Sequence, residues 1–148
     1  GNMADDVIVS DLDGTLTVDD KGVPYPDKAA DPAVVRAVAA AKAAGYKVVI
    51  ATSRNMRTYN GDVGLIRTHT LPVIESWLAR TGVEHDAIVV GKTWCGPRGF
   101  YVDDKNLHVE EFAFRFAGPY AGRSVDVVSL VADPAHLADL HRSHVRLE

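Results

Sequence analysis

The stretch Val7-Ile8-Val9-Ser10-Asp11-Leu12-Asp13-Gly14-Thr15-Leu16 decides the fold that this sequence predicts. Its apolar start is typical of a buried strand in a parallel sheet. Asp11 and Asp13 follow that strand, at the edge where open α/β sheets bind ligands. Because residues two apart in an extended chain face the same way, both carboxylates can line one site while Leu12 faces the core. A hard cation such as Mg²⁺ would relieve the repulsion between them, and Gly14 permits a sharp turn out of the strand.

The composition is that of one globular domain, which we expect to span residues 3–146 of the 148. Residues 1–2 and 147–148 resemble cloning remnants. The net charge of −4 gives no global bias toward nucleic acid. The one cysteine, Cys95, excludes an internal disulfide and suits a reducing cytosol. No apolar run is long enough to cross a bilayer and the N-terminal residues lack the apolar region of a signal peptide, so we expect a cytoplasmic protein without membrane insertion.

Strands and helices alternate along the chain after this first strand. Asp31 and Pro32 are typical of a helix start, and Gly45 of its end. A second helix should run from near Thr70 to Gly82. The further strands predicted are 46–51, 87–90 and 100–102. This order predicts an α/β fold, a three-layer α/β/α Rossmann-like sandwich with a mainly parallel sheet.

The remaining segments are polar or irregular. Residues 17–30 are expected to form a loop or small hairpin at the rim of the site, and residues 55–69 a long functional loop. Residues 125–131 could form an edge strand and residues 135–144 a helix. The segment after Glu111 has no assigned role.

The four predicted strands end in side chains that suit phosphoryl transfer to an aspartate. In a parallel sheet these ends meet at one edge. Taken singly, each has a structural explanation: an aspartate caps a helix or fills a turn, a threonine is structural, and a lysine is solvated. Their joint order favours function. The residues are Asp11 and Asp13, Thr52, Lys92, and Asp103 with Asp104.

This order resembles the haloacid dehalogenase (HAD) superfamily, mostly Mg²⁺-dependent phosphatases with an aspartate nucleophile. The resemblance implies that Asp11 attacks phosphorus and that Asp13 acts as general acid and base. Thr52 would hydrogen-bond a phosphoryl oxygen, and Lys92 would offset negative charge.

The resemblance also implies a set of Mg²⁺ ligands. These are the Asp11 carboxylate, the Asp13 backbone carbonyl and one of the acidic pair. Asp104 is the first choice, with Asp103 orienting Lys92, and the reverse assignment stays open.

Four segments, residues 51–59, 69–72, 90–96 and 99–104, are similar to small bacterial HAD proteins labelled capsule biosynthesis phosphatases. That similarity implies a sugar phosphate or a phosphorylated polysaccharide precursor as substrate. Arg54, Arg57 and His69 are the candidate substrate-binding residues, against the alternatives of solvated or capping side chains. The loops near the site are too short for a separate cap domain. An open site suits a large substrate, or cover from a neighbouring subunit of a homo-oligomer.

Two other functions stay open at this stage. One is a phosphatase for nucleotides or nucleic-acid ends, which the lack of basic charge disfavours, so that no nucleic-acid partner is expected. The other is a non-catalytic HAD-like domain that binds a phosphorylated ligand. Because every catalytic position of the family pattern is filled, the enzyme is favoured.

Overall fold

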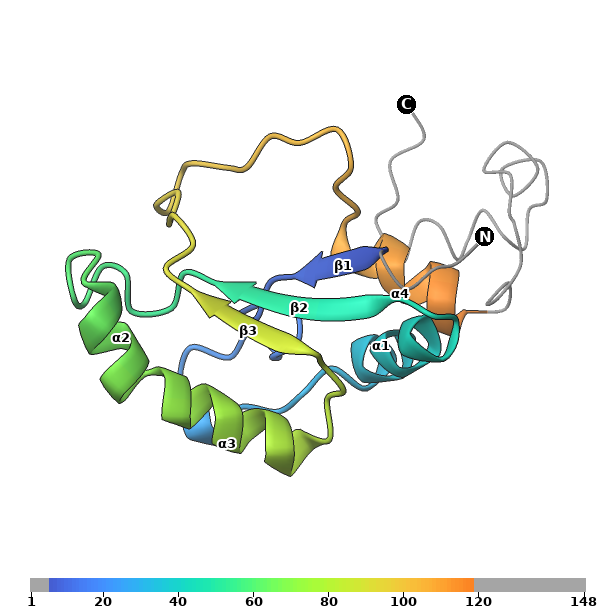
Figure 1. Cartoon of the computed structure of the whole chain (residues 1–148), viewed down its shortest axis with the longest axis horizontal. Helices are drawn as coiled ribbons and strands as arrows, with labels where there is room; N and C mark the ends of the chain where they lie inside the picture. Colours follow the sequence, from blue (N-terminus) through green and yellow to red (C-terminus); the bar gives the residue numbers. More distant parts are fainter. Residues whose placement is uncertain (1–5, 119–148) are drawn as a thin grey trace.

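The computed structural model describes residues 6–118, which form a parallel sheet with helices packed against it (Figure 1). The strands are β1 (Val7–Ser10), β2 (Lys47–Thr52) and β3 (Ala87–Val90), in the order β1-β2-β3. Both pairings are parallel, so the carboxyl ends of all three strands lie at one edge. The predicted α/β class and its parallel sheet are confirmed.

The helices begin and end where local chemistry favours it. The Asp31 carboxylate accepts a hydrogen bond from the Ala33 N–H at 3.0 Å, the N-cap that the sequence predicts. Gly82, at φ 72°, ends the second long helix in the left-handed conformation that glycine tolerates. The elements are the 3₁₀ helix η2 (Tyr25–Asp27) and the α-helices α1 (Pro32–Ala43), α2 (Val63–His69), α3 (Leu71–Thr81) and α4 (Val109–Ala117).

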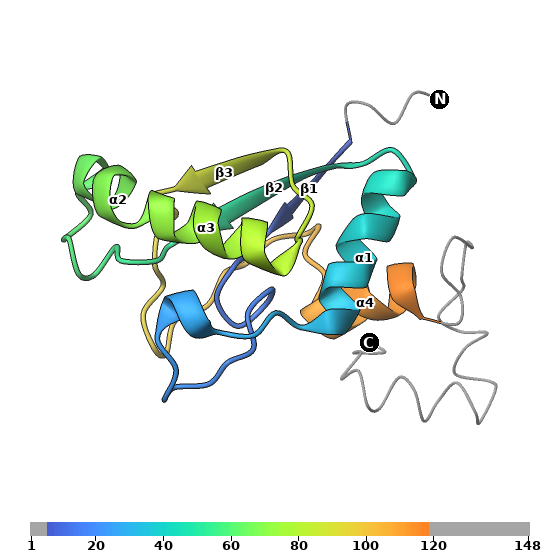
Figure 2. The ribbon, with the colours of Figure 1, turned by 90° about the horizontal axis from the view of Figure 1, so that it is seen from below.

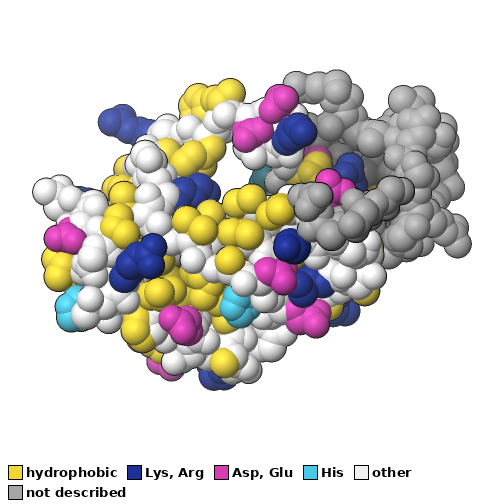
Figure 3. All heavy atoms as spheres, in the orientation of Figure 1, with side chains coloured by type: hydrophobic (Ala, Val, Ile, Leu, Met, Phe, Trp, Pro, Cys, Tyr) yellow, Lys and Arg dark blue, Asp and Glu magenta, His cyan; other side chains and the backbone are white. Residues whose placement is uncertain are grey.

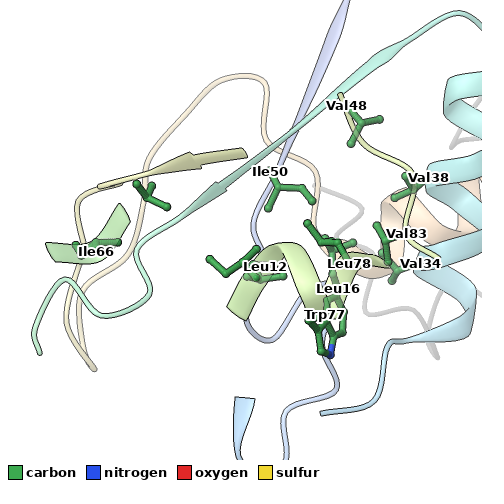
Figure 4. Packing of buried hydrophobic residues seen from close by; sticks show 12 residues of the cluster. Leu12, Leu16, Val34, Val38, Val48, Ile50, Ile66, Trp77, Leu78 and Val83 are labelled. Atoms are coloured by element: carbon green, nitrogen blue, oxygen red, sulfur yellow. The ribbon is translucent and has the colours of Figure 1, made fainter. Parts of the chain in front are cut away.

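The hydrophobic core lies between one face of the sheet and helices α1 and α3 (Figures 2 and 4). Val48 and Ile50 of β2 point into it, and Trp77 of α3 lies there with 2% of its surface exposed. The turn after β1 contributes Leu12 and Leu16, both fully buried. The segment that follows the sheet's first strand is therefore fixed by packing on the core, which holds the site residues beside it in place.

The opposite face of the sheet is apolar and open to solvent in the part of the chain that the structure describes. Val9 is 66% exposed and Val89 is 49% exposed. In Figure 3 hydrophobic side chains gather on this side of the molecule, and in Figure 1 the segment 91–108 arcs past the β1 edge of the sheet without covering this face. Within residues 6–118, no helix is long and apolar enough to cross a membrane.

Two predicted segments differ from the structure. Residues 55–69 were expected to be all loop, but α2 occupies Val63–His69, capped by the Asp62 carboxylate. Because α2 buries Ile66 alone, its sequence lacks helical periodicity. Residues 100–102 form no strand, and Phe100 and Val102 are 79% and 87% exposed. Three apolar residues have too few neighbours to fix a strand without a partner to pair with.

The C-terminal predictions fall partly within the described residues. Helix α4 covers residues beyond Glu111, and it packs against α1. The Phe116 ring meets Tyr46 edge to face, with centroids 5.7 Å apart. Residues 125–131 and 135–144, predicted as a strand and a helix, lie outside the described residues.

Candidate active site

The carboxyl edge of the sheet gathers residues from three separate segments. Asp11 follows β1, Thr52 is the last residue of β2, and Lys92 lies two residues beyond β3. Thr52 is paired in register with Val90, and the Lys92 N–H donates to the Thr52 carbonyl at 3.2 Å. The topology therefore brings these three side chains to one edge, as the sequence predicts.

A tight turn after β1 places the two aspartates. The Leu12 carbonyl accepts the Leu16 N–H at 2.9 Å, and the Gly14 N–H donates to the Thr17 Oγ1 at 3.0 Å. Gly14 adopts φ 75°, which other residues rarely do. Leu12 is fully buried, whereas Asp11 and Asp13 are half-buried. Leu12 therefore faces the core, as predicted, while both carboxylates keep contact with solvent.

The Asp11 carboxyl lies in a partly desolvated position. Burial raises its pKa, and the charge of Asp13 adds to the rise. The Leu12 N–H, which donates to Oδ1 at 2.8 Å, and the charge of Lys92 oppose it. Within residues 6–118 the other oxygen, Oδ2, accepts no hydrogen bond. One carboxylate oxygen is thus held by the backbone while the other is free to react.

Asp13 forms a bidentate ion pair with Arg54, which comes from the segment after β2. The guanidinium Nε and Nη2 lie 3.0 and 2.8 Å from its two oxygens. The Arg54 side chain is only 1% exposed and the Asp13 side chain 32%. Arg54 was expected to bind substrate, but in the structure its contact is with a predicted catalytic residue.

In the part of the chain that the structure describes, the side chains of Thr52 and Lys92 each make one defined contact. Thr52 is 1% exposed, and its Oγ1 accepts the backbone N–H of Arg54 at 3.1 Å, which leaves the hydroxyl proton free to be donated. The Lys92 Nζ lies 4.3 Å from the centre of the Tyr101 ring, a cation–π contact. The edge therefore carries an ammonium group and, beneath the surface, a hydroxyl with a proton to donate.

The acidic pair does not join this group. Asp103 accepts the Lys105 N–H at 2.7 Å in a local turn, and both Asp103 and Asp104 are exposed. In the described part of the chain, no three acidic, histidine or cysteine side chains come close enough together to hold a metal. Because residues 100–102 do not form a strand, nothing carries the pair to the edge of the sheet.

The two remaining predicted residues lie on the segment after β2. Arg57 is exposed, with its guanidinium 5.8 Å from the centre of the Trp94 ring. His69 is exposed at the end of α2 and stacks on Tyr59, with centroids 5.8 Å apart. Neither contacts Asp11 or Asp13.

Tyr25 is a residue that sequence reasoning missed. Its ring, carried by η2, lies 4.0 Å from the Arg54 guanidinium carbon. The only available signal was an aromatic residue within a segment otherwise rich in glycine, proline and aspartate.

Comparisons with known proteins agree with this geometry. Residues 8–63 match the model of a family described as haloacid dehalogenase-like hydrolase. A structural-genomics target from Vibrio cholerae is 35% identical, with a TM-score of 0.70 over 93% of this chain and 98% of that one. The chain belongs to the haloacid dehalogenase-like hydrolase family, as its motifs indicate.

Other solved structures are more distant. A heptose 1,7-bisphosphate phosphatase from B. bronchiseptica, solved with magnesium and phosphate, is 23% identical, with a TM-score of 0.41 over 63% of this chain. It is matched over 53% of its own length. A Pnkp1/Rnl/Hen1 complex is 20% identical, with a TM-score of 0.45 over 80% of this chain and 35% of that one. Likeness at this level carries no argument about function. No curated protein matches the chain.

Proposed function

We propose that this family member is a Mg²⁺-dependent phosphomonoester hydrolase that works through an aspartyl-phosphate. The observation that carries the proposal is the gathering of Asp11, Asp13, Thr52 and Lys92 at one edge of a parallel sheet. A nucleophile, an acid–base group, a hydroxyl donor and a cation are the parts that such a transfer needs.

Asp11 is the nucleophile in this proposal. Its Oδ2 is free, and its Oδ1 is held by the Leu12 N–H. As Oδ2 forms a bond to phosphorus, the bond from phosphorus to the leaving oxygen breaks. Asp13 gives a proton to that oxygen and then takes one from the water that hydrolyses the aspartyl-phosphate. Such proton transfers typically contribute ~10²–10⁴-fold to a rate.

Thr52 and Lys92 stabilise the transferring group. The Thr52 hydroxyl donates its proton to a phosphoryl oxygen while its oxygen accepts the Arg54 N–H, which holds the hydroxyl in place. Lys92 supplies a positive charge that also favours the ionised form of Asp11. Both act where negative charge develops, which is where electrostatic stabilisation accelerates a reaction most.

The donor atoms near β1 fit Mg²⁺. The Asp11 Oδ1, which keeps a second acceptor site beside its bond from the Leu12 N–H, would be one hard oxygen ligand and would leave Oδ2 to attack phosphorus. The Asp13 backbone carbonyl, which accepts no hydrogen bond within residues 6–118, would be another. Mg²⁺ commonly keeps several waters and needs few protein ligands when a phosphate is present. When bound, the ion would neutralise repulsion between the carboxylates and the phosphate. Asp104 or Asp103 is the proposed further ligand. The Mg²⁺ concentration needed for activity is measured in the single variants Asp104→Asn and Asp103→Asn, and the variant that needs more Mg²⁺ has lost the ligand.

The proposed substrate is a sugar phosphate or a phosphorylated precursor of capsular polysaccharide. The support is the similarity of residues 51–59, 69–72, 90–96 and 99–104 to the capsule biosynthesis phosphatases. The structure adds that, between β1 and α1, the chain forms only η2 and a bridge between Thr17 and Ala30. An active site without a cap accommodates a large glycan. Exposed Arg57 remains a proposed contact for an anionic group, and His69 a proposed substrate contact.

The decisive experiment is phosphate release from sugar phosphates, nucleotides and 4-nitrophenyl phosphate, with Mg²⁺ and with EDTA. Asp11→Asn should abolish release, and Asp19→Asn, on an exposed loop, is the matched control that should retain it. Release that persists in Asp11→Asn would refute the nucleophile. Preference for nucleotides would replace the sugar substrate. Binding of Mg²⁺ and phosphate without turnover would show a non-catalytic domain.

A further inference from the structure

We propose that Arg54 is a positioning residue that fixes the Asp13 carboxylate for proton transfer, and that Tyr25 in turn fixes Arg54. The inference rests on the proposed function, in which Asp13 is the general acid. Neither Arg54 nor Tyr25 belongs to the proposed catalytic group of Asp11, Asp13, Thr52 and Lys92.

The Arg54 guanidinium fork contacts both oxygens of Asp13, at 3.0 and 2.8 Å. A fork with two parallel hydrogen bonds fixes the plane of the carboxylate as well as its position. Each carboxylate oxygen has two acceptor sites, so Asp13 keeps one free site per oxygen for a proton. The pair therefore orients the acid without consuming it.

The burial of Arg54 argues against direct substrate binding. Its side chain is 1% exposed, and its remaining Nη1 is buried without a hydrogen-bond partner in the described residues. Nε and Nη2 already donate to Asp13 and Nη1 is enclosed, so this guanidinium has no accessible N–H group left for a phosphate. Exposed Arg57, three residues further on, has no such constraint.

Arg54 also connects the ends of two strands. Its backbone N–H donates to the Thr52 Oγ1 at 3.1 Å while its side chain holds Asp13. Asp13 and Arg54 are 41 residues apart in sequence. A single residue thus sets the acid of the β1 turn relative to the hydroxyl at the end of β2.

The Tyr25 ring packs against the Arg54 side of this pair. Its ring lies 4.0 Å from the Arg54 guanidinium carbon, and the residue is 40% exposed. A planar guanidinium stacks well on an aromatic face. The segment that carries Tyr25 is anchored to α3, because the Trp77 Nε1 donates to the Lys28 carbonyl at 2.7 Å and the Arg80 Nη2 to the Pro26 carbonyl at 2.8 Å. The aromatic cover is therefore attached to the rigid core.

The test compares two substrates of similar size that differ in their leaving group, benzyl phosphate and 4-nitrophenyl phosphate. As the bond from phosphorus to the leaving oxygen breaks, a benzyl alkoxide must receive a proton, whereas nitrophenolate leaves without one. The ratio kcat/KM reports this first transfer for both. Misplacing Asp13 should therefore slow the benzyl substrate selectively.

Arg54→Lys, which keeps the charge but loses the fork, should lower kcat/KM for benzyl phosphate by about 10²-fold and for 4-nitrophenyl phosphate by about tenfold or less. Tyr25→Leu should also lower kcat/KM more for benzyl phosphate than for 4-nitrophenyl phosphate, by smaller factors than Arg54→Lys. Tyr25→Phe should behave as the unmodified protein, because the tyrosine hydroxyl makes no hydrogen bond in the described residues. Arg36→Gln, exposed on α1, is the control.

Equal loss on both substrates would overturn the positioning role and indicate a structural one. A raised KM with unchanged kcat would overturn it in favour of substrate binding. Should Arg54→Lys fail to fold, Tyr25→Leu decides the question by the same criterion. Failure of the proposed function has a separate signature: no release from either substrate by the unmodified protein, or release that survives Asp11→Asn.

Discussion

Replacing Trp77 by phenylalanine should destabilise the protein by about 2–3 kcal/mol. The indole is 2% exposed in the core, and its Nε1 donates to the Lys28 carbonyl at 2.7 Å. Loss of that hydrogen bond costs about 1 kcal/mol. The smaller ring removes two buried carbons, at about 0.8 kcal/mol each. The Lys28 carbonyl keeps a bond from the Arg80 Nη2 at 3.0 Å, so no acceptor is left unpaired.

The free energy of unfolding is measured by urea titration with far-ultraviolet circular dichroism, because the substitution itself alters tryptophan fluorescence. Trp94→Phe is the matched control. Trp94 is 41% exposed, so its replacement should change stability by about 0.5 kcal/mol or less. A loss below about 1 kcal/mol in Trp77→Phe would contradict the reasoning, since the hydrogen bond alone should cost that much.

Three further predictions concern single aspartates. Burial raises the pKa of Asp11 above its ordinary value, so the folded protein loses stability as pH rises and this carboxyl ionises. Asp11→Asn removes that charge and should raise Tm near neutral pH in EDTA, whereas in acid the two proteins should have the same Tm. The Lys42 ammonium at 2.6 Å and the Val48 N–H lower the pKa of Asp86. The ionised carboxylate therefore stabilises the fold above the ordinary aspartate pKa, and this stabilisation is lost in acid. Asp86→Asn should lower Tm near neutral pH but not in acid. A Tm difference that is independent of pH in either variant would contradict its assignment. Asp31→Ala removes the N-cap of α1 and should cost about 1 kcal/mol in urea unfolding; no loss would show that the cap bond contributes nothing.

Asp103 and Asp104 lie on a segment that pairs with no strand in the described structure. This segment forms no strand itself and arcs past the β1 edge of the sheet (Figure 1). The motif order predicts that these carboxylates act with Asp11, yet their side chains meet solvent and a local turn. Whether they bind Mg²⁺ is tested by the paired asparagine variants proposed above.

The sequence by itself determined the three paired strands, the N-cap of α1, the end of α3 and the edge at which the candidate residues lie. These features depend on short-range patterns: apolar runs, the N-cap of Asp31, and the positive φ of Gly14 and Gly82. The alternation of Asp11, Leu12 and Asp13 follows from strand geometry alone. Such patterns act within a few residues, so they are legible without a fold.

Only the tertiary structure decided which side chains meet across the chain. The ion pair between Asp13 and Arg54 joins residues 41 positions apart, and Tyr25 reaches Arg54 from a third segment. Helix α2 was missed because it buries one residue, and the predicted strand at 100–102 failed because it has no partner to pair with. A side chain's partner depends on packing between distant segments, which local sequence patterns do not encode.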